Sequence, residues 1–188
     1  MRLVIQTNRL ILRLPVAADA PAIARQIGVW EVASMLSKVP WPYVPSMAED
    51  WLHMQEQSRR AGRSVSFMIA PADAPEEVLG NVSLNDRREG DAELGYWLGV
   101  DHWGQGIMSE AARAAVAFGF DVWGLETMSS GHFDDNRNSG RVLAKLGFTK
   151  TGSGPIPCAA RNNAAVPHTY LALEAAEWWR GPGSATSL

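Results

Sequence analysis

The chain has 188 residues and a formal net charge of −3, which is the size of one domain with a single substantial core. Hydrophobic residues make up 46% of it and charged residues 20%, values typical of a globular protein that exclude a disordered or fibrous chain. The slight negative charge, without a run of Lys or Arg, argues against nucleic acid as a partner, because its phosphates need a basic face.

The cysteine content and the first residues indicate the cellular compartment in which we expect the protein. Cys158 is the only cysteine, so no intrachain disulfide can form. The opening "MRLVIQTNRL" lacks the apolar segment and the cleavage site of a signal peptide. No apolar run approaches the roughly 20 residues that cross a bilayer. We therefore expect a cytoplasmic protein without a membrane partner.

The first third of the sequence predicts a strand, a helix and a loop. Leucines alternate over Asn8 to Pro15, which is typical of a half-buried strand. Asp19 stands where it can cap a following helix, with Pro21 tolerated in its first turn. The stretch "VPWPYVP" is too rich in proline for a helix. We expect it to be an ordered loop that carries Trp41 and Tyr43.

A second helix and three strands are predicted next. Ser46 and Glu49 have the spacing of a capping box, which predicts a helix from about Met47 to Arg60. Three successive strands with turn signals between them then follow, in the stretches "SVSFMIA", "EVLGNVSLND" and "AELGYWLG". Their proximity in sequence predicts an antiparallel meander.

In the last half of the chain, helices separate the strands. After a glycine turn, a helix should run to about Trp123, and a strand "LETMSSGHF" should follow it. The expected remainder is a helix from about Asn136 to Leu146, a strand starting at "GFTKTG", a strand from His168 to Glu174 and a short helix with Trp178 and Trp179. We find no repeat or linker, so we predict one domain over residues 1–180 with a flexible tail over 181–188.

The turn "GQG", Gly104 to Gly106, is the first functional signal. Backbone N–H groups at a helix start lack intrahelical partners and lie at the positive end of the helix dipole, so they stabilise an anion. Glycines without a Cβ atom let a bulky diphosphate approach. A tight strand-to-helix turn without a ligand is the alternative, and the turn alone does not decide between them.

Neighbouring residues narrow the phosphate-binding alternatives. Ile107 and Met108 stand where a P-loop would need Lys and Ser or Thr, which excludes a P-loop NTPase. Ser109 stands where a dinucleotide-binding turn would have its third glycine, and the turn follows a meander rather than opening a βαβ unit. A pantetheine cofactor with its pyrophosphate at the helix start remains.

The stretches "AELGYWLGVDHWGQGIMSEA" and "DNRNSGRVLAKLGF" together resemble the GNAT N-acetyltransferases, and among them the RimJ/RimL-like branch. The resemblance implies an α/β (α+β) fold, with a mixed, mostly antiparallel sheet of about seven strands that is flanked by helices and splayed between its fourth and fifth strands. It also implies acetyl-CoA as cofactor and direct attack by an amine in a ternary complex. The acceptor would be a peptide N-terminus or a small amine, and a homodimer is left open.

The resemblance places the cofactor on particular residues. The strand backbone would bind the acyl carbonyl, the glycine loop the pyrophosphate, and the start of the helix from about Asn136 to Leu146 the pantetheine arm. The residues implied are Leu98, Gly99, Val100, Trp103, Gly104, Gln105, Gly106, Ile107, Met108, Ser109, Asn136, Ser139, Arg141 and Lys145. For Arg141 and Lys145, contact with CoA phosphates and simple exposure on the helix remain open.

Acyl transfer needs a base for the amine and stabilisation of the leaving thiolate. Many relatives have an acidic Tyr where this chain has Leu143, and Ser139 fills the corresponding place of the RimJ/RimL-like branch, as an acid or only as a helix cap. Glu93 shares a strand face with Trp97 and is the candidate base, although a plain solvated charge is the alternative. His132 on the next strand is a second candidate.

Trp41, Tyr43 and Trp97 are the expected acceptor-side residues. The histidines show no ligand spacing with the lone cysteine, so we expect no metal site. A non-catalytic acyl-CoA-binding regulatory module is the alternative function, because the expected Tyr is missing at Leu143. A nucleotide-binding regulator that uses the same turn is disfavoured by the strand order.

Overall fold

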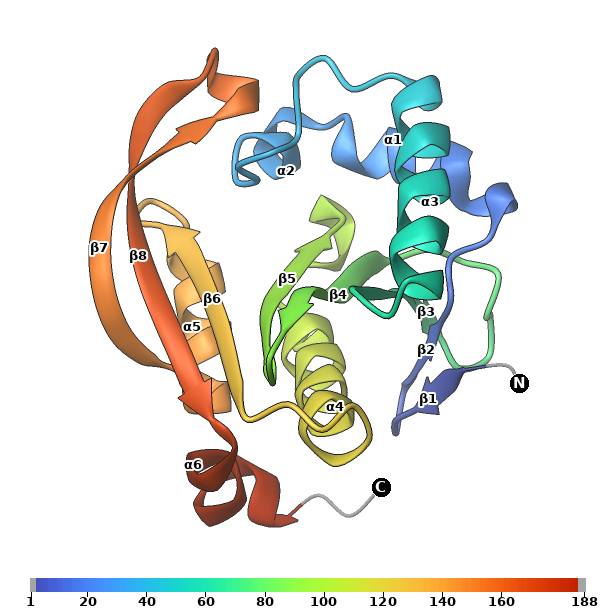
Figure 1. The fold of residues 1–188 in the computed structure, drawn as a ribbon. Coiled ribbons are helices and arrows are strands. Elements are labelled where there is room, and N and C mark those ends of the chain that lie inside the picture. The colour runs from blue at the N-terminus through green and yellow to red at the C-terminus, as the bar shows by residue number, and fades with distance from the viewer. Residues whose placement is uncertain (1–2, 186–188) are drawn as a thin grey trace.

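The computed structural model describes residues 3–185 and forms one open sheet with the strand order β1-β2-β3-β4-β5-β6-β8-β7 (Figure 1). The strands are β1 (Val4–Gln6), β2 (Leu10–Arg13), β3 (Val65–Pro71), β4 (Gly80–Arg88), β5 (Asp91–Leu98), β6 (Thr127–Phe133), β7 (Thr149–Cys158) and β8 (Ala164–Glu174). The sequence predicted about seven strands, and the additional strand is the short β1 at the sheet edge.

Most neighbouring strands run antiparallel, as expected. β3, β4 and β5 form the predicted meander, with Phe67 opposite Val82 and Val82 opposite Tyr96. Only β5 and β6 are parallel among the strand pairs described. The mixed, mostly antiparallel α/β architecture is therefore confirmed.

Helices cover both faces of this sheet. The α-helices are α1 (Ala20–Ile27), α2 (Trp30–Ala33), α3 (Pro45–Arg60), α4 (Ile107–Asp121), α5 (Arg137–Leu146) and α6 (Ala175–Arg180), and the 3-10 helices are η1 (Ala17–Asp19), η2 (Val100–His102), η3 (Ala159–Arg161) and η4 (Pro182–Ala185). The alanine-rich α4 packs with α5 and α6 in the larger core, against Leu84, Leu94 and Leu98 of the sheet. On the opposite face, α1 and α3 pack against Met68 and Trp97.

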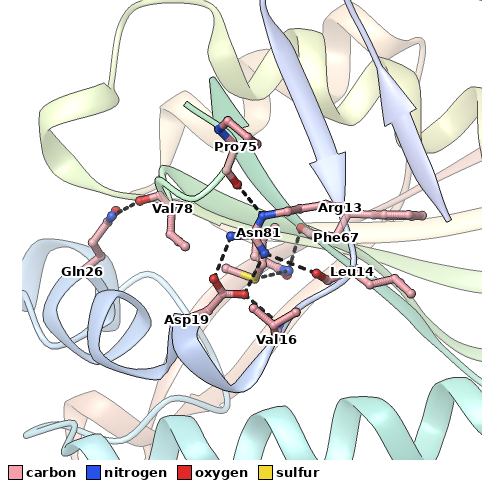
Figure 2. A network of polar contacts seen from close by, with 10 residues as sticks. Arg13, Leu14, Val16, Asp19, Gln26, Phe67, Pro75, Val78 and Asn81 are labelled. Atoms are coloured by element: carbon pink, nitrogen blue, oxygen red, sulfur yellow. Dashed lines mark hydrogen bonds and ion pairs between the residues drawn. The ribbon is translucent and has the colours of Figure 1, made fainter. Parts of the chain in front are cut away.

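Two helix starts differ from the sequence prediction. The carboxylate of Asp19 does not cap α1 through its side chain. It instead binds the Arg13 guanidinium at 2.7 and 2.9 Å and accepts from the Val16 N–H at 2.8 Å (Figure 2). A buried carboxylate needs such a partner. Helix α3 begins at Pro45, one residue before Ser46, so Ser46 is not its N-cap.

The network around Arg13 joins three parts of the chain that are far apart in sequence. Besides Asp19, the guanidinium donates to the backbone oxygens of Pro75 at 2.6 Å and Leu14 at 3.3 Å (Figure 2). Nearby, the Asn81 side-chain amide donates to the backbone oxygen of Phe67 at 2.8 Å. These bonds fix η1 and α1 against the sheet.

The parallel pair β5 and β6 separates part-way along its length. Register pairs run only from Asp91 and Thr127 to Glu93 and Ser129, although β5 continues to Leu98 and β6 to Phe133. Figure 1 shows the two strands close together at one end and far apart at the other. Just past the last pair, Ser130 Oγ donates to the Leu94 backbone oxygen at 2.8 Å. The predicted splay between the fourth and fifth strands of the sequence analysis is therefore confirmed.

Part of the predicted flexible tail has regular structure. Pro182–Ala185 form η4, and the Arg113 guanidinium donates to the Pro182 backbone oxygen. Gly183 lies so close to the Trp178 ring that a Cβ atom would be 2.4 Å from the indole nitrogen. The remaining positions 186–188 of the predicted tail lie outside the described residues. Among the helices that are described, none is long and apolar enough to cross a membrane.

Candidate active site

A cleft of about 890 Å³ opens where β5 and β6 diverge. Its walls come from β5, from the loop that leads into α4, from β6 and from the start of α5. Residues that follow α2 and the middle of β8 complete the lining. Divergent strands leave backbone and side chains of two sheet segments facing one space, so several functional groups meet here.

The glycine loop forms the start of α4 at one wall of this cleft. Gly106 is the N-cap, with φ of 76°, and Gly104 has φ of 74°. This left-handed conformation favours glycine. No side chain caps α4 in the described structure, and a Cβ atom at Gly104 would have no neighbour within 4 Å. The helix start is therefore open to a ligand, and its N–H groups and dipole suit an anion.

The turn between β1 and β2 holds this loop in place. Arg9 donates to the Glu110 carboxylate at 2.7 Å and to the Gln105 backbone oxygen at 3.2 Å. Thr7 Oγ1 donates to the same carboxylate at 2.7 Å. Burial raises the pKa of Glu110, but the hydrogen bonds from Thr7 and Arg9 outweigh it and leave the pKa below its ordinary value. Arg9 thus neutralises an acid that would otherwise repel a phosphate at the helix start.

Internal hydrogen bonds fix the rest of the loop. The Trp103 indole N–H donates to the backbone oxygen of Leu98 at 2.8 Å. The side-chain amide of Gln105 donates to the Asp101 backbone oxygen at 3.0 Å. The loop is consequently tied to the end of β5 and to η2.

At the opposite wall, α5 begins with a capped first turn. Asn136 is its N-cap, and the Asn136 Oδ1 accepts from the Ser139 N–H at 3.1 Å. The helix cap is thus Asn136, and the Ser139 hydroxyl is used differently. It lies 2.8 Å from the hydroxyl of Tyr96 on β5. Leu143, where the resemblance would place a Tyr, is fully buried in the core.

Positive charge lies farther along α5. Arg141 and Lys145 both line the cleft, one turn apart, and Arg141 also donates to the Asn138 side chain at 3.2 Å. Together with the open helix start, these cations suit a ligand that carries several phosphates. The residues present therefore fit coenzyme A.

Two proton-transfer candidates lie on the strands that diverge. Glu93 is the last residue of β5 that pairs with β6, and it lines the cleft with an exposed side chain. His132 lies on β6, and its Nδ1 is 2.8 Å from the Phe133 backbone oxygen. Because a carbonyl only accepts, that nitrogen carries a hydrogen, and in a neutral ring Nε2 would be the acceptor. The ring packs over Gly140 of α5.

Comparison with known proteins identifies the family. Residues 9–149 match the family model described as Acetyltransferase (GNAT) domain. The chain belongs to the GNAT acetyltransferase family. This confirms the family that the sequence motifs predicted.

Individual relatives agree with this assignment of the GNAT domain. The uncharacterized N-acetyltransferase p20 of Bacillus licheniformis is 32% identical over 148 residues, covering 78% of this chain and 82% of p20. The [ribosomal protein uS5]-alanine N-acetyltransferase of Escherichia coli is 27% identical over 161 residues, which cover 78% of each chain. The structure of Mycobacterium smegmatis RimJ in complex with CoA-disulfide superposes with a TM-score of 0.77 at 21% identity, covering 93% of this chain and 89% of RimJ. That last likeness shows the fold.

Most cofactor residues expected from the sequence do lie together at the cleft of this GNAT domain. Three of the expected residues, Gly99, Val100 and Gln105, are not among those that line it. Gly99 faces away, because a Cβ atom there would be 2.0 Å from the Gln26 side chain of α1. Among residues 3–185, no group of three or more His, Cys, Asp or Glu side chains could hold a metal ion.

The expected acceptor-side aromatics lie elsewhere, with one exception. Trp97 lines the cleft, but Trp41 and Tyr43 do not. Trp41 packs edge-on against Trp30, with ring centroids 5.1 Å apart, and donates to the Gly28 backbone oxygen at 3.2 Å. Tyr43 packs beside α1, where burial and then Asp50 raise its pKa.

Residues that sequence reasoning missed occupy this side of the cleft. The segment at and after α2 contributes Val32, Met35 and Lys38, and β8 contributes His168 and Tyr170. Burial and the nearby His132 lower the pKa of His168, and Asp134 opposes them in part. Trp41 of the proline-rich loop lies beside Gly28 and Trp30 instead of at the cleft.

Proposed function

We propose that this protein is an acetyl-CoA-dependent N-acetyltransferase that transfers the acetyl group to the α-amine of a peptide or protein N-terminus. The observation that carries the proposal is that the open start of α4, Glu93 and Ser139 share one cleft at the divergence of β5 and β6. Membership in the GNAT family supports the activity, and the relative that acetylates a ribosomal protein alanine supports the acceptor class.

The two walls of the cleft would divide the binding of the cofactor between them. The backbone N–H groups of the first turn of α4 would hold the pyrophosphate, with Arg141 and Lys145 for further phosphates. Asn136 and Ser139 border the path of the pantetheine arm, and Leu98 ends the strand that faces the acyl group. When bound, the cofactor supplies an acetyl thioester to the point where the strands separate.

Side chains of the protein, and not groups of the cofactor, would transfer the protons. Glu93 accepts the proton of the attacking amine through a water molecule, which leaves the amine free to form its bond to the acyl carbon. The Ser139 hydroxyl donates a hydrogen bond to the departing sulfur. His132 borders the same space with an acceptor nitrogen and is the second candidate base. Direct attack in a ternary complex, a cytoplasmic location and a homodimer remain predictions.

The activity test is the release of CoA from acetyl-CoA with peptides that differ only at their amino terminus. We expect release with a peptide that begins with a free alanine and none with the same peptide blocked by a formyl group. Mass spectrometry should find the acetyl group on the α-amine and not on a lysine of the peptide. Small polyamines serve as a second acceptor class.

The alternative function gives a different result in this assay. A regulatory module would bind CoA in a calorimeter and yet release none from acetyl-CoA with any acceptor. The Gly104→Glu variant, which places bulk and negative charge at the start of α4, is the matched control for adventitious hydrolysis. Release that persists in that variant would not come from this cleft.

A further inference from the structure

Tyr96 connects β5 to α5 across one wall of the cleft. Its ring belongs to the face of β5 that carries Leu94 and Leu98, and it packs against the core under α4 and α5. The phenol oxygen lies 2.8 Å from Ser139 Oγ and 3.2 Å from the Ser139 backbone oxygen. Both residues line the cleft. Tyr96 is not among the site residues expected from the sequence.

The number of available hydrogen atoms limits the direction of the hydrogen bond between Tyr96 and Ser139. The Ser139 N–H already donates to Asn136, so capping α5 does not use the Ser139 side chain. Among residues 3–185, Tyr96 is the one hydrogen-bond partner of Ser139 Oγ. A phenol and a serine hydroxyl each carry one hydrogen and can each accept. The phenol has a single hydrogen and two acceptors within reach, Ser139 Oγ at 2.8 Å and the Ser139 backbone oxygen at 3.2 Å. If it donates to the nearer acceptor, Ser139 Oγ, the serine hydrogen is left to point into the cleft.

We propose that Tyr96 is a positioning residue: its phenol donates to Ser139 Oγ and thereby directs the serine O–H toward the sulfur of the bound coenzyme. This inference deepens the proposed function and rests on it. In the reaction, the bond between the acyl carbon and sulfur breaks, and sulfur departs with the electron pair. The carbon to nitrogen bond forms, and the amine proton passes to Glu93. The hydroxyl of Ser139 stabilises the thiolate and keeps its own proton.

The environment of Tyr96 agrees with a positioning role and not with an acid. Burial raises the pKa of Tyr96 to about 12, although the hydrogen bond with Ser139 lowers it somewhat. A thiol has a pKa of roughly 8.5, so this phenol keeps its proton beside a thiolate. Leu143 carries no polar group at the position where a Tyr acid was expected. The phenol of Tyr96 on β5 therefore reaches the α5 wall of the cleft, on which Leu143 has no polar group.

The first test measures the bound coenzyme without turnover. The ultraviolet absorbance of the thiolate is titrated with pH for saturating CoA bound to wild type, Tyr96→Phe, Ser139→Ala and the double variant. A hydrogen bond to the charged form lowers a pKa, so we expect the bound thiol in wild type to lie about one unit below free CoA. Both single variants should raise it by equal amounts, and the double variant should raise it no further.

A second tyrosine at the same cleft supplies the matched control. Tyr170→Phe removes a phenol from β8 that makes no hydrogen bond to Ser139 in the described structure, so the bound thiol should titrate as in wild type. A thiol pKa that moves equally in Tyr170→Phe and Tyr96→Phe would overturn the proposal, because it would report only general polarity. Ser139→Ala leaves the β5 core intact. An unchanged thiol pKa in that variant overturns the proposal even if Tyr96→Phe unfolds.

The second test is a double-mutant cycle on turnover. Because Tyr96 acts only through Ser139, each single variant and the double variant should all lose about tenfold in kcat, with the KM for acetyl-CoA within about twofold. A double variant about a hundredfold slower would mean independent roles and would overturn the inference alone. The wild type could also prove inactive while its bound thiol still shows the expected pKa shifts. That result would contradict the proposed function and would leave the positioning contact established.

Discussion

Glu93, Tyr96 and Trp97 lie within five positions of one strand, yet each reaches a different environment. Glu93 is opposite Ser129 at the last pair of the parallel ladder, so its side chain is exposed where the strands separate. Alternation places Trp97 in the core beside α1 and Tyr96 in the core beside α5. A single strand therefore contributes a carboxylate, a phenol and an aromatic wall to the same cleft.

Replacing Glu93 tests the base. We expect Glu93→Gln to lower kcat by about 10² to 10⁴-fold at neutral pH, the range for a positioned proton-transfer group. Part of this loss should be recovered at higher pH, where more of the amine is unprotonated. A pH profile of turnover at saturating acetyl-CoA provides the measurement.

A matched control for this variant is Glu76→Gln, since Glu76 is an exposed carboxylate in the loop before β4. It should leave the pH profile unchanged. If Glu93→Gln keeps full activity at neutral pH, Glu93 is not the base, and His132 or an ordered water is next.

Helix α4 is fixed against the sheet so that its N-terminus stays open toward the cleft. Most of its residues are buried alanines, glycine and large apolar side chains, which fix it against the sheet. Its start has no side-chain cap in the described chain, and its one acidic first-turn residue, Glu110, is neutralised by Arg9. The energy of an uncapped helix start, typically about 1 kcal/mol, can then be recovered by a bound anion.

The Gly104→Glu substitution tests this helix start. The added carboxylate lies where the diphosphate should bind, so we expect the CoA dissociation constant to rise by at least about tenfold, given helix-terminus effects of about 1 to 2 kcal/mol. Titration calorimetry supplies the measurement. Gly62→Glu is the control for backbone strain, because Gly62 has φ of 66° and likewise no atom within 4 Å of a Cβ.

In this comparison, both glutamates carry the same conformational penalty, and only one lies at the cleft. The Gly62 variant should lose stability and keep its CoA affinity. Equal affinity in the two variants would show that the anion site lies elsewhere on the molecule.

In the whole molecule, the cleft lies between an earlier and a later segment of the chain. A ligand bound in it would contact both segments. The glycine loop and β5 precede residue 107, whereas β6, α5 and β8 follow it. Contacts on both sides mean that CoA should bind the folded state alone. Ligand at about 100 times its dissociation constant then adds about 2.7 kcal/mol to the free energy of unfolding.

Thermal denaturation checks this stabilisation. For a domain of this size, each kcal/mol shifts the Tm by about 2 to 4 °C, so saturating CoA should raise the Tm by about 5 to 11 °C. NAD and ATP at the same concentration should raise it far less. An equal shift with NAD would contradict the assignment of the cleft to CoA.

Local signals account for what the sequence predicted correctly. Alternating apolar residues and turn residues lie close together along the chain, and they predicted the meander before the glycine loop and the helix after it. The loop itself was visible because two glycines stand directly before a helix. The extra strand β1 has only three residues, too few for a pattern, and the glycines and prolines of β7 conceal its length.

The parts that the sequence could not predict depend on distant partners. Arg9 meets Glu110, and Tyr96 meets Ser139, across 101 and 43 positions of the chain. Asp19 has the residue type of a helix cap, but the partly buried Arg13 guanidinium holds its carboxylate in an ion pair instead. Such pairings become visible only when the sheet order is known.

The short parallel ladder between β5 and β6 also bears on the lifetime of the native state. Three register pairs and the Ser130 side chain join the two segments of the sheet at this seam, and Glu93 and Ser129 of the last pair also line the cleft. Because few hydrogen bonds cross this seam, partial unfolding should cost the least free energy there. Opening it would release the coenzyme and expose the chain to proteases in a single event. We therefore expect the coenzyme concentration to set how long each copy of the protein resists proteolysis.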